Sequence, residues 1–373
     1  MRLAALIAAA LLCCALALPA RAAETFAAEE LARLQQAADM LPEKRVSARE
    51  MAEKALRGEA VFDWNEAAEW VLRAAREGLL ARRRLFVQLF AAALLAALLG
   101  RFQDAFGEGT AQAAQWVCLL YTALLLAREC AGVFDSVRRT VSGAVKGAET
   151  LFPLLLTALA AVGGTGSAAA LQPAVTLAVT AAAAVSEKIC LPLAAAFLAL
   201  SMLDCMTDAW SLSRASKLCK TACGMALGVG LTAFTGLLSV RGFTAAARDG
   251  LTLRAAKFAA DTFVPEVGGA LSDTAETAFA GALMVKNALG VTGMALIALF
   301  FLTPLTEICL SALAFRAAAA ATEPFSDARM ARCFDAAAGA MGMLAGCLTG
   351  VMAMFLVLAG QAVAAGGVIA MMA

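Results

Sequence analysis

The feature that most constrains this chain is a series of apolar stretches that recurs from Leu85 to the C-terminal end. Each approaches the length of about 20 residues that an α-helix needs to cross the ~30 Å hydrocarbon core of a bilayer, although some are shorter. The pattern predicts an all-α, polytopic integral membrane protein with about seven or eight spans, some of them broken or re-entrant. The apolar runs that carry these spans are Leu85–Gly100, Trp116–Phe134, Leu151–Val185, Ile189–Leu203, Ala222–Val240, Ala288–Leu302, Leu305–Ala321 and Ala337–Ala359.

The stretch 151–185 is apolar but is interrupted by a glycine-rich run at 163–167 and by Gln172-Pro173. It is either a tight hairpin of two spans or a re-entrant pair. The run GGTGS is not a phosphate-binding loop, because no Gly-Lys-Ser/Thr follows it and no soluble strand precedes it. Glycine instead permits a bend or a close helix contact, and the alternative is part of a translocation path. The predicted helix-break or hinge positions here are Gly163, Gly164, Gly166 and Pro173.

The composition supports the membrane assignment. Hydrophobic residues make up 62% of the chain and charged residues 16%, and the mean hydropathy is +0.79. Soluble domains average about 45–50% apolar and about 25% charged residues, so this excess is too large for a bigger soluble core. The formal net charge is +1. Because there is no basic excess, we expect the lipid bilayer, and no nucleic acid, as a partner.

The N-terminal part differs from the rest. Residues 1–23 have the pattern of a cleavable signal peptide, with cleavage after Ala22 or Ala23; the alternative is an uncleaved anchor. Residues 24–84 are polar, with apolar residues at helical spacing, and predict two or three amphipathic helices. This region is either a small extension on the membrane surface or a docking module for another subunit. Residues 85–373 form the predicted membrane domain.

The orientation in the membrane stays open at this level. A cleaved leader places residue 24 outside the cytoplasm, yet Arg82-Arg83-Arg84 then adjoins the first span on that same side. This conflicts with the tendency of Lys and Arg to flank spans in the cytoplasm. Either the leader is an uncleaved anchor, or one early span is interfacial.

The central stretch, residues 237–273, is neither uniformly apolar nor uniformly polar. On a helix, Arg254, Lys257 and Asp261 form one narrow stripe at i, i+3 and i+7, and the rest of the helix is apolar. Such a helix suits a membrane interface or the wall of a wet cavity. We expect the stripe to face a cavity or a partner subunit, together with Glu266 and Asp273, near a predicted break at Pro265, Gly268 and Gly269.

Other ionisable residues within the apolar runs have a simpler interpretation. Glu187-Lys188 and Lys286-Asn287 are expected to mark helix ends at the interface, where lysine extends its ammonium group toward water.

Catalytic and metal chemistry find little support. The chain has no histidine, which removes the commonest general base and the commonest metal ligand. The eleven cysteines include no Cys-x-x-Cys pair, and most lie in apolar runs, so we interpret them as small buried hydrophobic residues. No Ser-Lys arrangement or pair of embedded aspartate motifs is present. The sequence therefore predicts a protein that is not an enzyme, with no cofactor and no metal.

Three stretches resemble the stage III sporulation protein AE family of endospore-forming bacteria. They are LLSVRGFTAAARDGLTLRAAKFAADTFVPEVGGALSD at 237–273, LFPLLLTALAAVGGTGSAAALQP at 151–173, and LMVKNALGVTG at 283–293, followed by a proline-containing span. The resemblance covers roughly residues 85 to 360, in matching order.

The resemblance implies a permease-like membrane subunit of the channel complex that links mother cell and forespore. That complex is thought of as a feeding or secretion channel. It also includes a secretion-type ATPase and ring-forming proteins, and it supports late forespore gene expression. The expected location is the mother-cell membrane that surrounds the forespore. Two alternatives stay open: a self-contained secondary transporter of a small solute, and a structural membrane anchor for the ring subunits.

Overall fold

The computed structural model describes residues 48–57, 108–161, 164–206, 212–263, 268–323 and 328–372, together with Gln35 and scattered residues between 69 and 98. Within these ranges, no side-chain description applies to 48, 49, 56 and 108–112, to 241–280 apart from Asp249, Leu251 and Thr252, to 328, or to 366–372. The predicted signal peptide, most of the amphipathic region and most of the predicted span Leu85–Gly100 therefore lie outside the described residues.

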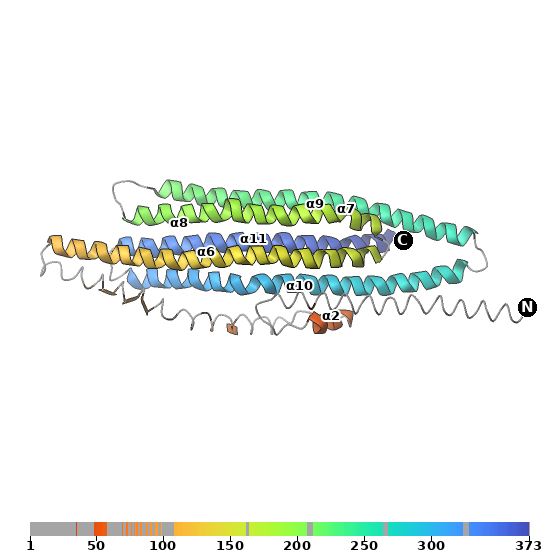
Figure 1. Cartoon of the computed structure of the whole chain (residues 1–373), viewed down its shortest axis with the longest axis horizontal. Coiled ribbons are helices and arrows are strands. Elements are labelled where there is room, and N and C mark those ends of the chain that lie inside the picture. Colours follow the sequence, from red (N-terminus) through yellow and green to blue (C-terminus); the bar gives the residue numbers. More distant parts are fainter. Residues whose placement is uncertain are drawn as a thin grey trace, which may run out of the picture.

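The described elements are all helices, which confirms the predicted all-α class for this part of the chain. Figure 1 shows the long helices side by side, with the short α2 alongside α10. The elements are α2 (Ala48–Leu56), α6 (Glu108–Ala161), α7 (Thr165–Ala184), the π-helical turn η1 (Val185–Cys190), α8 (Leu191–Met206), α9 (Ser213–Phe263), α10 (Gly268–Thr322) and α11 (Ala328–Met372).

The helices are much longer than a bilayer is thick. Helix α6 has 54 residues, α9 has 51 and α10 has 55. At 1.5 Å per residue each is about 80 Å long, more than twice the ~30 Å hydrocarbon core. Helices α7 and α8 are joined through η1 into one continuous rod. Each rod therefore extends well beyond any single membrane that it crosses.

Five helices in the described part are long and apolar enough to cross a membrane, where the sequence predicted seven or eight spans. Most of one predicted span, Leu85–Gly100, lies outside the described residues, and other predicted boundaries lie inside continuous helices. Helix α10 continues through Pro304, so Ala288–Leu302 and Leu305–Ala321 belong to one helix. Helix α7 likewise continues through Pro173. A proline removes one backbone hydrogen bond, and packing along the rest of a long helix outweighs that loss.

Helix α6 ends at Ala161 and α7 begins at Thr165, so 151–185 contains a hairpin between two long helices.

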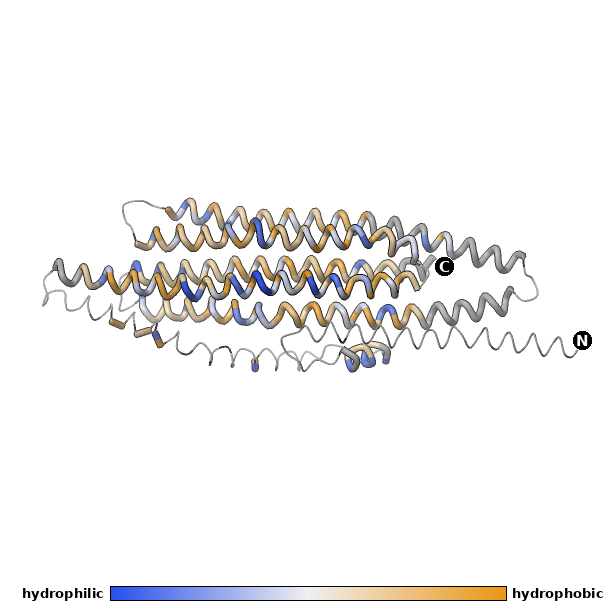
Figure 2. Tube along the Cα trace, in the orientation of Figure 1, coloured by the Kyte–Doolittle hydropathy of each residue, from blue (hydrophilic) through white to orange (hydrophobic). Residues whose placement is uncertain are grey.

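Helix α11 lies at the centre of the bundle and packs against α10, α9, α6 and α8. On the side of α6 that faces α11, buried residues recur at intervals of three and four positions, as in left-handed helix bundles. The buried residues of this repeat are Leu126, Cys130, Val133, Val137, Val141, Ala144, Ala148, Leu151, Leu155 and Ala158. Figure 2 shows that apolar residues predominate along the described bundle, with polar positions at intervals.

Helices α9 and α10 form a hairpin that projects past the ends of the other helices in Figure 1. The stretch 237–273 makes up the far part of this hairpin: α9 ends at Phe263 and α10 begins at Gly268. Gly268 and Gly269 therefore lie in the first turn of α10.

Candidate functional site

The start of α7 is held by a carboxylate from another helix. Its N-cap residue is Gly164, which has no side chain to cap the exposed N–H groups of the first turn. Asp249 of α9 takes this role: its Oδ2 accepts a hydrogen bond of 2.6 Å from the backbone N–H of Ser167. A carboxylate at a helix N-terminus is also favoured by the helix dipole. Asp249 therefore fixes the α6–α7 hairpin to α9.

Gly166 is what allows Asp249 to come so close. A Cβ atom at Gly166 would lie 2.5 Å from Asp249 Oδ1, a distance that real side chains do not tolerate. Beside it, the Ser167 side chain is fully buried, and its hydroxyl has no hydrogen-bond partner among the described residues. The sequence prediction of a hinge thus falls on a tightly packed helix start.

A buried cation lies at the same end of the bundle. Lys286 of α10 is 2% exposed, and its Nζ donates a hydrogen bond of 2.5 Å to the carbonyl oxygen of Val363 in α11. Gly290, one turn further along α10, also meets Val363, because a Cβ there would lie 2.1 Å from Cγ2. The expectation that Lys286 marks a helix end was wrong: it lies inside α10 and joins α10 to α11.

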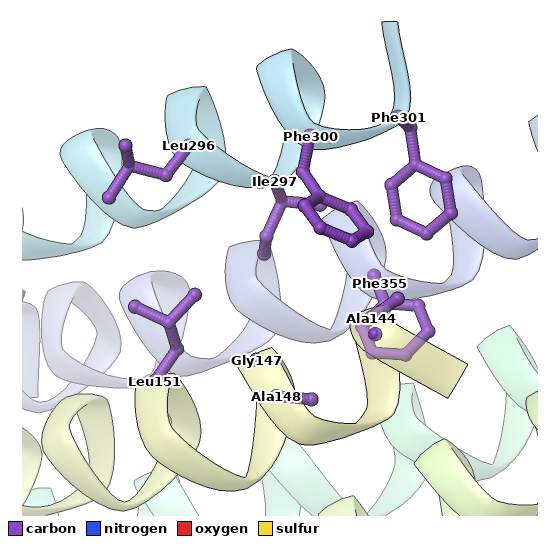
Figure 3. Close-up of a pocket in the computed structure, with 10 residues that line it drawn as sticks. Ala144, Gly147, Ala148, Leu151, Leu296, Ile297, Phe300, Phe301 and Phe355 are labelled. Atoms are coloured by element: carbon purple, nitrogen blue, oxygen red, sulfur yellow. The ribbon is translucent and has the colours of Figure 1, made fainter. Parts of the chain in front are cut away.

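A small apolar cavity of about 40 Å³ lies among the described helices. Figure 3 shows it between α6, α10 and α11, with Leu151, Leu296, Ile297, Phe300, Phe301 and Phe355 around it. This volume is close to the ~30 Å³ that one water molecule occupies in the liquid, and the lining offers such a water no polar partner. The cavity is therefore a packing defect and not a solute site.

A larger groove of about 440 Å³, whose surface is mainly apolar, lies on the outside between α6 and α7. Apolar residues form much of its lining, and exposed polar side chains project from both helices. The polar residues are Glu149, Thr157, Gln172, Thr176 and Thr180.

The cysteines are free thiols in the part of the chain that the structure describes. Cys309 is exposed and Cys219 half-buried, whereas the others there are buried, in keeping with small hydrophobic residues. Ser186 Oγ and Cys347 Sγ lie 3.0 Å apart and share a hydrogen bond. In the described ranges, no group of three or more His, Cys, Asp or Glu residues is placed to hold a metal ion.

The structure places the predicted site residues in two groups. Gly164, Gly166 and Pro173 lie at the α6–α7 turn and in α7, and Gly268 and Gly269 begin α10. The stripe residues Arg254, Lys257 and Asp261 belong to α9, and Asp273 belongs to α10. The structure describes the backbone of these four residues but not their side chains. Gly163, Pro265 and Glu266 lie outside the described residues altogether.

Sequence reasoning missed Asp249 and Ser167. Asp249 lies within the singled-out stretch 237–273, but not on the predicted stripe. The partners are 82 positions apart, and nothing in either segment specifies the other. The only sequence signal for this contact was the position of the Asp249 carboxylate beside an apolar run.

Comparison with known proteins gives one consistent family. The sequence model of the family described as Stage III sporulation protein AE matches residues 46–366. A relative with this name from Bacillus subtilis (strain 168) is 28% identical over 263 residues, which cover 69% of this chain and 64% of the relative. The match thus spans about two thirds of each protein. No solved structure matches the chain.

Proposed function

Because this chain belongs to the stage III sporulation protein AE family, we propose that it is a permease-like membrane subunit of the sporulation channel complex. This complex links mother cell and forespore and supports late forespore gene expression. The chain resides in the mother-cell membrane around the forespore. Its partners are the other membrane and ring-forming subunits and the secretion-type ATPase. The family match includes all five candidate spans, which supports the assignment.

The observation that carries the proposal is an uncharged zone that occupies only part of the bundle's length. Four helices have stretches of at least about 20 residues without Asp, Glu, Lys or Arg, the length that crosses a bilayer. These stretches are 165–186 in α7 and η1, 221–240 in α9, 287–306 in α10 and 336–365 in α11. They overlap along the bundle: Ser186 contacts Cys347, and Gly230 lies near Met354. We call this overlap the uncharged zone.

Charged residues bound this zone. The hairpin turn with Asp249 and the buried Lys286 lie at one end. Beyond the other end the helices continue with charged residues, among them Lys188, Lys220, Glu307 and Asp335. A membrane protein with a helical body outside the bilayer and a projecting hairpin has surfaces for soluble and membrane partners. That arrangement favours a subunit of an assembly.

We infer an orientation from the Lys and Arg residues at the end where the α8–α9 and α10–α11 connections lie, although Arg241, Arg248, Arg254 and Lys257 follow the uncharged stretch of α9 at the opposite end. Arg214, Lys217 and Lys220 follow the first connection, and Arg329 and Arg332 follow the second. Lys and Arg near span ends favour the cytoplasm. We therefore orient this end toward the mother-cell cytoplasm, and the α9–α10 hairpin tip toward the space between the two membranes. This places the tip on the side where the predicted cleaved leader would release the N-terminal region.

The continuity of the helices weighs against a self-contained secondary transporter. Such transporters commonly build their solute site from helices that are unwound near the bilayer midplane. In the uncharged zone the described helices continue without unwound segments, and the irregularity seen there is the π-helical turn η1.

Purification from membranes of sporulating cells tests the proposal. Full-length tagged protein, solubilised in mild detergent, should retain ring-forming subunits and the secretion-type ATPase, and deletion of its gene should abolish a late forespore reporter. Uptake of a small solute by the pure protein in liposomes, without such partners, would instead support the transporter.

A further inference from the structure

The first turn of α7 holds a buried hydroxyl with unused hydrogen-bonding capacity. The Ser167 side chain is 0% exposed, and its Oγ has no hydrogen-bond partner among the described residues. Buried Thr122 and Thr292, by contrast, each donate to the carbonyl oxygen four positions back in their own helix. Buried polar groups in proteins are almost always paired, and those that the chain itself leaves unpaired mark positions for a water molecule or an ion. Ser167 therefore points to a small ligand.

The carboxylate beside this hydroxyl is only partly compensated. Asp249 is half-buried, and its Oδ2 accepts the hydrogen bond from the Ser167 N–H. Among the residues whose side chains are described, no Lys or Arg forms an ion pair with it. The start of a helix supplies the equivalent of only about half a unit of positive charge. A water molecule on Ser167 would leave the remaining negative charge of Asp249 in place, whereas a cation would satisfy both groups.

The two groups lie close enough to share one ligand. Oγ and N of Ser167 belong to the same residue, so the hydroxyl lies within a few ångströms of the carboxylate. Gly166 lets Oδ1 lie against the first turn of α7, and because Gly166 itself is exposed, water reaches this side of the turn. Helix α6 ends at the same turn, where the Leu159 carbonyl accepts a hydrogen bond from the Gly164 N–H. The last carbonyls of a helix lack partners within it and are further oxygen donors.

This donor set selects one chemical class of ligand. Carboxylate, hydroxyl and carbonyl oxygens suit hard cations, and in membrane proteins the carbonyls at helix ends coordinate Na⁺. Calcium sites use several carboxylates, and in the described ranges no group of three or more acidic, Cys or His residues is placed to hold an ion. A single carboxylate matches a single positive charge. The close approach at Gly166 favours a small ion.

We propose that the turn between α6 and α7 binds one monovalent cation of the size of Na⁺, coordinated by the Asp249 carboxylate and the Ser167 hydroxyl. The ion completes the partners of both side chains. It also strengthens the contact that fixes the α6–α7 hairpin to α9. The inference does not depend on the proposed function, because it needs only the fold.

Thermal unfolding of the full-length protein in detergent tests the site. The chlorides of Na⁺, Li⁺, K⁺ and choline are compared at equal ionic strength. A ligand that binds only the folded protein raises its stability in a saturable way. We expect the midpoint in Na⁺ to reach a plateau at least about 2 °C above that in choline, with a smaller rise in K⁺. Radiolabelled Na⁺ should bind with a stoichiometry of one.

Two variants remove single ligands of the ion. S167A deletes the hydroxyl but keeps the backbone N–H that Asp249 accepts, and D249N keeps an oxygen at the start of α7 but loses the charge. Both should lose the rise that is specific to Na⁺. S311A is the matched control, since Ser311 is equally buried but donates to the Glu307 carbonyl within α10. This variant should keep the rise.

Three results would overturn the inference. Equal midpoints in all four salts, without binding of radiolabelled Na⁺, mean that a water molecule completes Ser167. A Na⁺-specific rise that survives S167A places the ion elsewhere in the protein. Loss of the rise in S311A as well as in S167A means that the response follows stability and not the ligands. If D249N fails to accumulate, S167A alone decides, because it leaves the Asp249 contact with α7 intact.

Discussion

The Asp249 carboxylate of α9 accepts a hydrogen bond from the backbone N–H of Ser167 at the start of α7. This contact joins the two stretches that stand out in the sequence, the glycine-rich turn and the polar segment 237–273. It also marks one end of the uncharged zone, opposite the charges that begin at Glu187. The first two predictions concern this contact.

G166A should destabilise the protein, because the new methyl group occupies the space of Asp249 Oδ1 and forces the carboxylate off the helix start. The lost charged hydrogen bond corresponds to about 1.5–3 kcal/mol. The thermal midpoint of the detergent-solubilised protein measures the effect. G228A is the control, since nothing lies within 4 Å of a Cβ at that position of α9. Equal midpoints for the two variants would show that Asp249 simply moves aside.

D249A should lower the free energy of unfolding by about 0.5–2 kcal/mol, the usual effect of removing a capping side chain. D249N keeps an oxygen acceptor but loses the charge that the helix dipole favours, so its loss should be smaller. Unfolding in detergent compares the three proteins. A D249N that is less stable than D249A would contradict the capping role.

K286M should fold and be at least as stable as the parent protein, because it removes a buried charge while it fills nearly the same volume. K286A leaves a cavity and should lose about 2–5 kcal/mol, as large-to-small core substitutions do. Membrane level and thermal midpoint are the measurements. If K286M is as unstable as K286A, the hydrogen bond to Val363 contributes more than the desolvation of Lys286 costs.

The proposed orientation predicts opposite access for the two ends of the bundle. A single cysteine between Met206 and Leu212 should react with an impermeant reagent only after the mother-cell cytoplasm is opened. One between Phe263 and Gly268 should be reachable from the intermembrane side. If the two cysteines react from the opposite sides, the true orientation is the reverse of the proposed one. If both react from the same side, fewer helices cross the membrane than proposed.

The stripe in the far part of α9 stays a prediction of the sequence. R254C, K257C and D261C should all be labelled by a water-soluble thiol reagent, because three lipid-facing charges on one helix cost more than most spans tolerate. F258C and A259C, which lie off the stripe, serve as controls and should be protected. Labelling of F258C with inert stripe positions would show that the stripe does not face water.

The sequence by itself determined the membrane class, the all-helical secondary structure and the family. It also placed unusual backbone at the α6–α7 turn and near the end of α9. Hydropathy and glycine content are local properties, so a window of about 20 residues contains the information. The same locality placed predicted span boundaries inside continuous helices. The residues around Pro173 or Pro304 do not show which other helices pack there. That packing lets α7 and α10 continue through these prolines.

Only the tertiary structure decided which residues meet. Lys286 looked like a helix end, but α11 covers it and supplies the Val363 carbonyl as its partner. Asp249 looked like one more charge in a polar segment, yet it caps a helix whose first turn lies 82 positions away. Thr157 of α6 and Gln172 of α7 line one groove because the turn at Gly164 folds the two helices together. Burial and partnership depend on which helices pack against each other, and a single sequence does not encode that packing locally.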